Sequence, residues 1–484
     1  MFTKFSTFVI KPHHLINKNN NKKSLDLKLI SNNKIISNLL MSRCFGISSI
    51  QHQIHKFPFI SQASLALTQE RQRKDKIDIL KVSRIHLQRY SEVSKPIQKI
   101  PKIYTAESKV KVDWQDNQTS KFHNLWLRDH CKCSKCYHQI TKQRLLDTFS
   151  IPEDIKPLSI SPGSSGVEII WSGNDEHKSF FNWNWLRRHS YDPKFINSQQ
   201  ILNNKKTLWN AAKIKDNLPI VQYHKVMQNK EDLAIWLKNI DEFGFCFIDN
   251  VPPKVKETEE LAKRICFIRE SHYGKFWDFT ANMEHGDTAY STLALKAHTD
   301  NTYFTDPSGL QMFHLIEFEG EGGESLLADG FWMANQLKTK YPKAYQTLST
   351  IPIPSHSAGD SNVLIQPTPF AYPIFNHDSL TNTLYQIRYN NDDRSTMSHL
   401  SPNQIPEFYD ALRKWNELLS NKENEFWFQL YPGRVLIFDN WRILHGRASF
   451  VGHRRLIGAY LNWDDYRSKF KVLNLSNEEI LESL

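Results

Sequence analysis

The chain has 484 residues, of which 40% are hydrophobic and 12% aromatic, so it is long enough for two domains with sizeable cores. Its formal net charge is +11 at pH 7. Residues 1–69 carry nine Lys or Arg and one acid, a net +8, which leaves +3 for the other 415 residues. Because positive and negative charges nearly balance over residues 70–484, there is no reason to expect a nucleic-acid partner. No apolar run is long enough to span a bilayer, so we expect no membrane-spanning helix.

The first 69 residues are basic, rich in Asn and Ser and almost free of acids, a composition typical of mitochondrial transit peptides. Apolar residues among the first ten could form one face of a short amphipathic helix. The sequence therefore predicts an N-terminal extension over 1–100, a presequence plus linker, cleaved between Arg43 and Arg73. A chain with such a presequence is expected in the mitochondrial matrix. The alternative is a disordered extension of biased composition without a targeting signal, because the tract 17–23 is also an ordinary low-complexity segment.

From about residue 105 the composition changes to that of a small β-rich module. Short strands are expected at 110–112, 122–127, 167–171 and 178–185, with a turn at Gly173-Asn174. We place this module at 105–205.

The module holds a cysteine cluster. Cys131, Cys133 and Cys136 are three of the six cysteines and lie within six residues, which suits a metal better than a disulfide framework and indicates a reducing compartment. A structural zinc needs four ligands, so three thiolates nearly complete a site. The alternative is three free thiols.

The second module is expected over 215–484, and it mixes many short strands with fewer helices. Helical spacing predicts helices at 231–243, ended by Gly244, and at 257–270, 331–348 and 406–420. Strands are expected at 245–248, 311–318, 324–329, 384–390, 434–439 and 454–461. Few strand–helix units repeat, which favours an antiparallel sandwich or barrel, mainly β with flanking helices (α+β).

Candidate metal ligands lie in two places. His298 and Asp300 are two residues apart, so in an extended chain they share one face and could hold one ion. His445, in the segment FDNWRILHGR, offers a third ligand. Two His and one carboxylate with open positions is the arrangement of non-haem Fe(II) oxygenases. For any one of these residues, a structural role is the alternative.

An arginine follows the third candidate ligand. Period two puts Arg454, Leu456, Gly458 and Tyr460 on one face of a strand. A planar guanidinium is well shaped to hold a carboxylate by paired hydrogen bonds. Arg454 could thus bind a carboxylate beside the metal, with Tyr460 projecting into the same cavity.

These residues resemble the Fe(II)- and 2-oxoglutarate-dependent dioxygenases. The segments FDNWRILHGR, GEGGESLLADG and RYNNDDR resemble the butyrobetaine and trimethyllysine hydroxylases of carnitine biosynthesis, over about residues 110–470. The resemblance implies a double-stranded β-helix (jelly-roll) core preceded by a zinc-binding domain, and a homodimer. It implies iron on His298, Asp300 and His445, 2-oxoglutarate on Arg454 and Ser325, O2 as co-substrate and ascorbate as reductant. It also places His177 as the fourth zinc ligand.

The resemblance further implies a substrate with a quaternary ammonium group. Such a cation is bound by aromatic faces, because the ring quadrupole attracts it. The family's aromatic cage and a substrate-contacting Asn are matched here by Tyr273, Trp277, Tyr290, Tyr460 and Asn390. The alternative is that these aromatic residues belong to the core.

Two positions separate the two kinds of hydroxylase. Asp287 stands where the butyrobetaine enzymes carry Asn, and Asn301 where they carry Tyr. Trimethyllysine has an α-ammonium that butyrobetaine lacks, and Asp287 could pair with it. The resemblance therefore implies hydroxylation of trimethyllysine at C3, the first step of carnitine biosynthesis. Butyrobetaine hydroxylation is the alternative. A non-catalytic binder of methylated lysine is a second alternative, which would have no use for the triad and Arg454.

Overall fold

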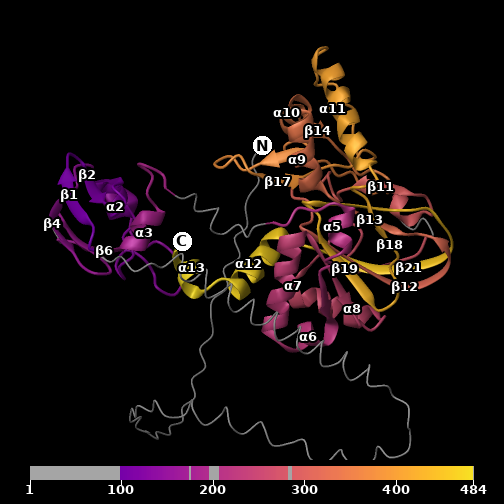
Figure 1. The fold of residues 1–484 in the computed structure, drawn as a ribbon, viewed down its shortest axis with the longest axis horizontal. Helices are drawn as coiled ribbons and strands as arrows, with labels where there is room; N and C mark the ends of the chain where they lie inside the picture. The colour runs from indigo at the N-terminus through magenta and orange to yellow at the C-terminus, as the bar shows by residue number, and fades with distance from the viewer. Residues whose placement is uncertain (1–98, 174–175, 196–205, 282–285, 483–484) are drawn as a thin grey trace, which may run out of the picture. The chain divides into compact units, whose positions relative to one another are not determined.

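The computed structural model describes residues 99–173, 176–195, 206–281 and 286–482 (Figure 1). The predicted presequence lies outside these residues. The predicted boundary near 205–215 lies partly outside them and stays a prediction. None of the helices in the described ranges combines the length and the apolar composition needed to cross a membrane.

The N-terminal module consists of two small antiparallel sheets, each followed by a short helix. The first contains β1 (Lys102–Ala106), β2 (Lys109–Asp113) and β3 (Thr119–His123), and α2 (Asn124–Asp129) follows it. The second contains β4 (Pro157–Pro162), β5 (Gly166–Trp171) and β6 (Lys178–Asn182), and α3 (Trp183–Arg188) follows it. A short 3-10 helix, η1 (Thr148–Ser150), lies between the two.

The strands predicted at 110–112 and 167–171 are confirmed. Those predicted at 122–127 and 178–185 are wrong from Asn124 and from Trp183 onward. The chain leaves each sheet and turns into a helix at Asn124 and at Trp183. In the second case the Asn182 side chain accepts a hydrogen bond from Asn184 N and caps the helix.

The two halves repeat one unit of three strands and a helix. Both helices carry the same pattern, WLRDH from Trp126 and WLRRH from Trp185. Nδ1 of the closing histidine lies 2.7 Å from Trp126 O in the first copy and 2.8 Å from Trp185 O in the second. In each copy the imidazole also stacks on that tryptophan, at 4.2 Å and 4.5 Å between ring centroids. The module is therefore built from two similar halves.

Two packed sheets form the core of the C-terminal module. The larger has the order β10 (Trp277–Phe279), β21 (Phe450–Leu461), β12 (Leu310–Gly322), β19 (Arg434–Asp439), β8 (Phe245–Asp249), β7 (Ile220–Gln222), with β9 (Ile268–Arg269) also paired to β21. The smaller has the order β11 (Leu295–His298), β20 (Ile443–Arg447), β13 (Ser325–Asp329), β18 (Phe426–Phe428). All pairings are antiparallel except that of β7 with β8.

One buried cluster contains residues of both sheets, among them Phe438 and Leu456 of the larger and Leu327 and Ile443 of the smaller. The predicted antiparallel jelly-roll core with flanking helices is thus confirmed. Gly458 on β21 allows a close approach, because a Cβ there would lie 2.0 Å from Met312 O and 3.0 Å from the Trp277 ring.

Helices cover both sheets. Buried residues of α6 (Tyr223–Gln228), α7 (Lys230–Phe243), α8 (Val255–Ile265) and α12 (Trp463–Asn474) pack on the larger sheet, and Figure 1 draws α7 and α8 beside β19. Those of α9 (Gly330–Lys340), α10 (Pro342–Thr350) and α11 (Gln404–Leu419) pack with residues of the smaller sheet. The remaining elements are α5 (Ala211–Lys215), η2 (Thr288–Tyr290), α13 (Asn477–Glu482) and two two-stranded sheets, β14 (Ile353–Pro354) with β15 (Ala371–Tyr372) and β16 (Phe375–His377) with β17 (Leu384–Ile387).

Two predicted helices differ from those observed. The helix predicted at 331–348 is two helices, because Pro342 starts a new one directly after Tyr341. The helix predicted at 257–270 ends at Ile265, since Cys266 is extended and Ile268–Arg269 pairs with β21. The stop of α7 at Gly244, which has φ +82°, is confirmed.

Candidate active site

The structure brings His298, Asp300 and His445 into one group. His298 ends β11, and its backbone pairs with that of His445 on β20. Nε2 of His298 lies 3.1 Å and Nε2 of His445 lies 3.8 Å from Oδ1 of Asp300, and the possible ligand atoms all lie within 4.8 Å of one another. Ligands at right angles and about 2.1 Å from one divalent ion would be about 3.0 Å apart. The group is therefore compact enough to hold one ion.

Hydrogen bonds to the other atoms of these residues leave the facing atoms for a cation. Nδ1 of His298 lies 2.6 Å from the Lys296 carbonyl oxygen, which favours a lone pair on Nε2. Oδ2 of Asp300 accepts hydrogen bonds from Gln311 Nε2 and Tyr460 Oη, each at 2.6 Å, so Oδ1 remains to face the histidines.

Asn440 fixes the backbone of the carboxylate ligand. Its Oδ1 accepts a hydrogen bond from Asp300 N at 2.8 Å, and its Nδ2 donates to Asp300 O at 3.0 Å. The next residue, Asn301, is 2% exposed and has φ +59°. Asn tolerates this left-handed conformation better than most side chains, which gives a physical reason for Asn at this position.

The electrostatics of the three side chains favour an ionised Asp300 beside one charged and one neutral histidine. Burial opposes ionisation of Asp300, but the charges of His445 and His298 and the hydrogen bonds outweigh it and lower the pKa of this carboxyl. Burial also disfavours the charged imidazole of His298, yet the hydrogen bond and charge of Asp300 raise its pKa to about 9. Burial and the charge of His298 lower the pKa of His445 to about 3. The ionised carboxylate and the neutral His445 suit a metal site.

A cavity extends from this group between the two sheets, and Arg454 lines it from β21. Its side chain is 8% exposed, and it forms no ion pair with any residue in the part of the chain that the structure describes. Burial and the nearby Arg447 lower its pKa to about 9. Ser325 lines the same cavity from β13 of the other sheet. An unpaired buried cation is costly, so this end of the cavity suits an anion.

Arg447 also lines the cavity, but its guanidinium donates hydrogen bonds to the carbonyl oxygens of Ala289, Ser291 and Leu293. It therefore holds the segment that carries η2 in place, and Arg454 is the better candidate for binding a ligand.

The four predicted cage residues all line the cavity. They form two ring pairs: Tyr273 stacks with Tyr290 at 6.4 Å, and Trp277 meets Tyr460 edge to face at 4.3 Å. The hydroxyl of Tyr460 also bonds to Asp300, so this ring links the aromatic wall to the metal group.

Asp287, Asn301 and Asn390 line the same cavity. Oδ1 of Asp287 accepts a hydrogen bond from Ala289 N, and its Oδ2 accepts one from Tyr273 Oη at 2.5 Å. Asp287 thus holds the hydroxyl of Tyr273 and caps η2, the short 3-10 helix that ends at Tyr290. Asn390 Oδ1 accepts a hydrogen bond from Asp392 N at 3.0 Å.

The cysteine cluster forms a second group. Nε2 of His177 lies 3.4 Å from Cys131 Sγ, 3.6 Å from Cys133 Sγ and 3.4 Å from Cys136 Sγ. A tetrahedral zinc with bonds of about 2.3 Å to sulfur and about 2.05 Å to nitrogen would separate S and N by about 3.6 Å. The four residues fit such an ion, so His177, inferred from resemblance alone, lies where a fourth ligand must lie.

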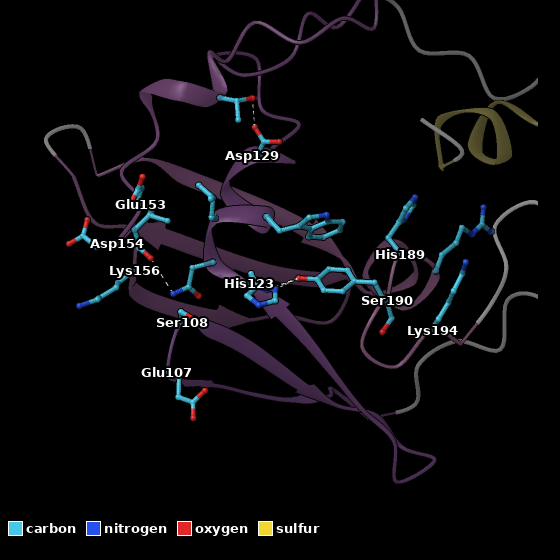
Figure 2. Close-up of a pocket in the computed structure, with 17 residues that line it drawn as sticks. Glu107, Ser108, His123, Asp129, Glu153, Asp154, Lys156, His189, Ser190 and Lys194 are labelled. Atoms are coloured by element: carbon cyan, nitrogen blue, oxygen red, sulfur yellow. Dashed lines mark hydrogen bonds between the residues drawn. The ribbon is translucent and has the colours of Figure 1, made fainter. Parts of the chain in front are cut away.

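A larger hollow lies elsewhere, on the N-terminal module. Its volume is about 1250 Å³, against about 140 Å³ for the cavity beside Asp300. Figure 2 shows Glu153, Asp154 and Lys156 at one end and His189 and Lys194 at the other. These charges do not converge on a point, so volume alone does not identify the active site, and the ligand geometry does.

Sequence reasoning missed several cavity residues, among them Gln311, Tyr303, Asp393 and Arg447. Gln311 and Phe313 alternate along β12 and both line the cavity, but a single Gln on a strand has no distinctive pattern in the sequence. The other three lie in loops or beside residues with more obvious roles.

Comparisons with known proteins agree with this site. The family described as "Taurine catabolism dioxygenase TauD, TfdA family" matches residues 208–460, and "Gamma-butyrobetaine hydroxylase-like, N-terminal" matches residues 102–187. Trimethyllysine dioxygenase of Meyerozyma guilliermondii is 42% identical over 78% of this chain and 96% of that protein. The mitochondrial trimethyllysine dioxygenase of Homo sapiens is 38% identical over 77% of this chain and 90% of that protein. Gamma-butyrobetaine dioxygenase of a Pseudomonas species is 31% identical over 76% of this chain and 94% of that protein. The chain therefore belongs to the TauD, TfdA family and is an Fe(II)- and 2-oxoglutarate-dependent dioxygenase.

Proposed function

We propose that this enzyme hydroxylates N6,N6,N6-trimethyllysine at C3, the first step of carnitine biosynthesis. The observation that carries the proposal is one cavity that joins three possible metal ligands, four aromatic rings and a buried arginine that pairs with no acid among the described residues. Identity of 42% and 38% to trimethyllysine dioxygenases, against 31% to a butyrobetaine dioxygenase, supports trimethyllysine over butyrobetaine.

His298, Asp300 and His445 would hold the iron, and their facing atoms fit an ion of this size. Iron with bound 2-oxoglutarate supplies an oxidant for an unactivated C–H bond, using O2 and releasing succinate and CO2. The protein's own contribution is to place one carbon of the substrate beside the metal and keep other groups away from it. Ascorbate would serve as the external reductant.

Arg454 and Ser325 would hold 2-oxoglutarate. A guanidinium presents paired donors that match a carboxylate, and its burial strengthens the interaction. Ser325 adds a hydroxyl donor from the opposite sheet. The two residues would therefore fix the end of the co-substrate that does not meet the metal.

The aromatic residues Tyr273, Trp277, Tyr290 and Tyr460 would surround the trimethylammonium group. This cation cannot donate hydrogen bonds, so ring faces are its natural partners. Asp287 and Asn390 would contact the rest of the substrate. We infer that Asp287 also keeps Tyr273 and Tyr290 in place through the hydrogen bonds described above.

The N-terminal module and the basic extension would serve stability and targeting, respectively. The module over 105–205 would bind a structural zinc through Cys131, Cys133, Cys136 and His177, and the module over 215–484 would carry catalysis. The basic extension would direct the chain to the mitochondrial matrix, a location supported by the mitochondrial names of the mammalian relatives. We expect a homodimer.

The test is to supply the purified enzyme with Fe(II), 2-oxoglutarate and ascorbate and compare trimethyllysine with butyrobetaine. We expect succinate and a product hydroxylated at C3 from trimethyllysine, at a kcat/KM at least about tenfold above that for butyrobetaine, since one lost ionic contact costs about that much. A reversed preference would make the chain a butyrobetaine dioxygenase. Tight binding of trimethyllysine without any succinate would favour the non-catalytic binder.

A further inference from the structure

Asp393 is an ionisable residue of the cavity to which the proposed reaction assigns no role. It follows β17 in the segment RYNNDDR, lines the cavity and is half-buried. Among the residues that the structure describes, no Lys or Arg forms an ion pair with it. The cavity thus contains a carboxyl without a cation as well as a guanidinium without an anion.

The position of Asp393 is fixed by the surrounding backbone. Its Oδ2 accepts a hydrogen bond from Thr302 Oγ1 at 3.1 Å, and its carbonyl oxygen accepts one from His356 N at 2.9 Å. The carbonyl of Thr302 in turn accepts from the buried Arg388, at 2.7 Å. No described residue donates a hydrogen bond to Oδ1. The carboxyl is therefore held in one place with one oxygen available.

The surroundings of Asp393 favour a bound cation. Burial, with the like charges of Asp300 and Asp287, raises the pKa of this carboxyl to about 7, although the charge of His298 opposes the shift. A cation bound beside it would remove this penalty, because an opposite charge favours the ionised form.

Besides the candidate metal ligand Asp300, the cavity has two other acids, Asp287 and Asp392, which are less suited to this role. Both carboxylate oxygens of Asp287 already accept hydrogen bonds, from Ala289 N and from Tyr273 Oη. Asp392 is exposed, so water weakens its interaction with any cation. Asp393 combines partial burial, a fixed position and a free oxygen.

We propose that Asp393 binds the α-ammonium of the amino-acid substrate and so selects an α-amino acid over a substrate whose only cation sits among the aromatic rings. This inference rests on the proposed function, and it identifies which residue tells trimethyllysine from a trimethylammonium carboxylic acid. Asp393 is then a specificity-determining residue of the substrate site.

The test compares trimethyllysine with 6-(trimethylammonio)hexanoate, the same molecule without its α-amino group. In Asp393→Asn the Thr302 hydrogen bond can persist, because an amide oxygen also accepts. We expect KM for trimethyllysine to rise about tenfold to a hundredfold, while KM for the deaminated analogue stays within about threefold. Calorimetric titration of each ligand into the metal-loaded enzyme, without O2, should give the same pattern in Kd. Thermal unfolding of Asp393→Asn close to that of the wild type would confirm that the change is local.

The matched controls are Asp392→Asn and Asp287→Asn. Asp392→Asn should change neither KM. If Asp287→Asn loses discrimination between the two ligands while Asp393→Asn keeps it, Asp287 is the anchor and the inference about Asp393 is wrong. If the wild-type enzyme turns over neither ligand but hydroxylates butyrobetaine, the proposed function fails instead, so the two failures are distinct.

Discussion

Two ionisable side chains, Arg454 and Asp393, line one cavity; among the described residues, no acid pairs with Arg454 and no Lys or Arg pairs with Asp393. A folded chain that leaves groups of both signs unpaired accepts a cost that a ligand can offset. The ligands we propose for them are a dicarboxylate at one end and a cationic amino acid at the other, the pair that the proposed hydroxylation of trimethyllysine requires.

Replacing the guanidinium tests the first of these partners. In Arg454→Met we expect KM for 2-oxoglutarate to rise about tenfold to a hundredfold, because a charge-assisted hydrogen-bonded pair is lost. The neighbouring Arg455 is the matched control: it pairs with Asp278 and Glu317 instead. Arg455→Met should leave KM for 2-oxoglutarate unchanged. Steady-state kinetics with varied 2-oxoglutarate measure both, and equal effects of the two substitutions would contradict the assignment.

The two hydrogen-bond donors to Asp300 lead to a second prediction at the scale of single residues. Gln311 and Tyr460 both bond to Oδ2, so they orient Oδ1 toward the metal. Gln311→Leu should weaken binding of Mn(II), a spectroscopic substitute for iron, about tenfold to a hundredfold.

Tyr460→Phe separates this role from that of the cage, because it keeps the ring and removes only the hydroxyl. We expect weaker Mn(II) binding by electron paramagnetic resonance titration and a smaller change in Kd for trimethyllysine. Unchanged Mn(II) affinity in both variants would show that the two donors do not position Asp300.

The candidate ligands were predictable from sequence because their spacing or their family motif is distinctive. His298 and Asp300 share one face of a strand end, and the antiparallel pairing of β11 with β20 brings His445 opposite them. Gln311 and Asp393 carry no such pattern. The role of a lone Gln on a strand, or of one acid in an adjacent pair, can be inferred only from the side chains that the fold places beside it.

At the scale of elements, the sequence predicted the strands better than the points at which they end. Period two continues past Asn182 and an apolar run follows Asn124, yet the chain turns into α2 at Asn124 and into α3 at Trp183. Local alternation cannot reveal that turn, because burial of Leu127 and Leu186 on the following helices decides it. The repeat of WLRDH in WLRRH was visible in the sequence, and it would have predicted the same element after both sheets.

The zinc site gives the prediction at this scale. Four candidate ligands from two loops would tie the two halves of the N-terminal module together, so metal binding would contribute free energy of folding. Cys133→Ser should remove the zinc found by elemental analysis and lower the Tm seen by calorimetry. The control is Cys266→Ser, a half-buried cysteine after α8, which should keep both. A zinc-free wild-type protein with full thermal stability would refute a structural role for the metal.

At the scale of the whole molecule, the charge is divided unevenly between two parts of the chain, to which we assign different tasks. Residues 1–69 carry +8 of the total +11, and the chain's match to its fungal relative covers 96% of that protein with only 78% of this chain. A potential that is negative inside the matrix favours entry of a cationic segment, whereas catalysis makes no use of it.

We therefore expect the mature enzyme to begin between Arg43 and Arg73, which mass spectrometry of protein isolated from mitochondria would determine. Replacing Lys4, Lys11, Lys18 and Lys22 by Gln should leave the chain in the cytosol with an intact Met1, because these four residues supply about half of the net charge of the segment. The variant should keep the wild-type kcat/KM for trimethyllysine, since no residue of the cavity is altered. A wild-type enzyme recovered from the cytosol with Met1 in place would contradict the presequence, and loss of activity in the variant would give the extension a role in the folded enzyme.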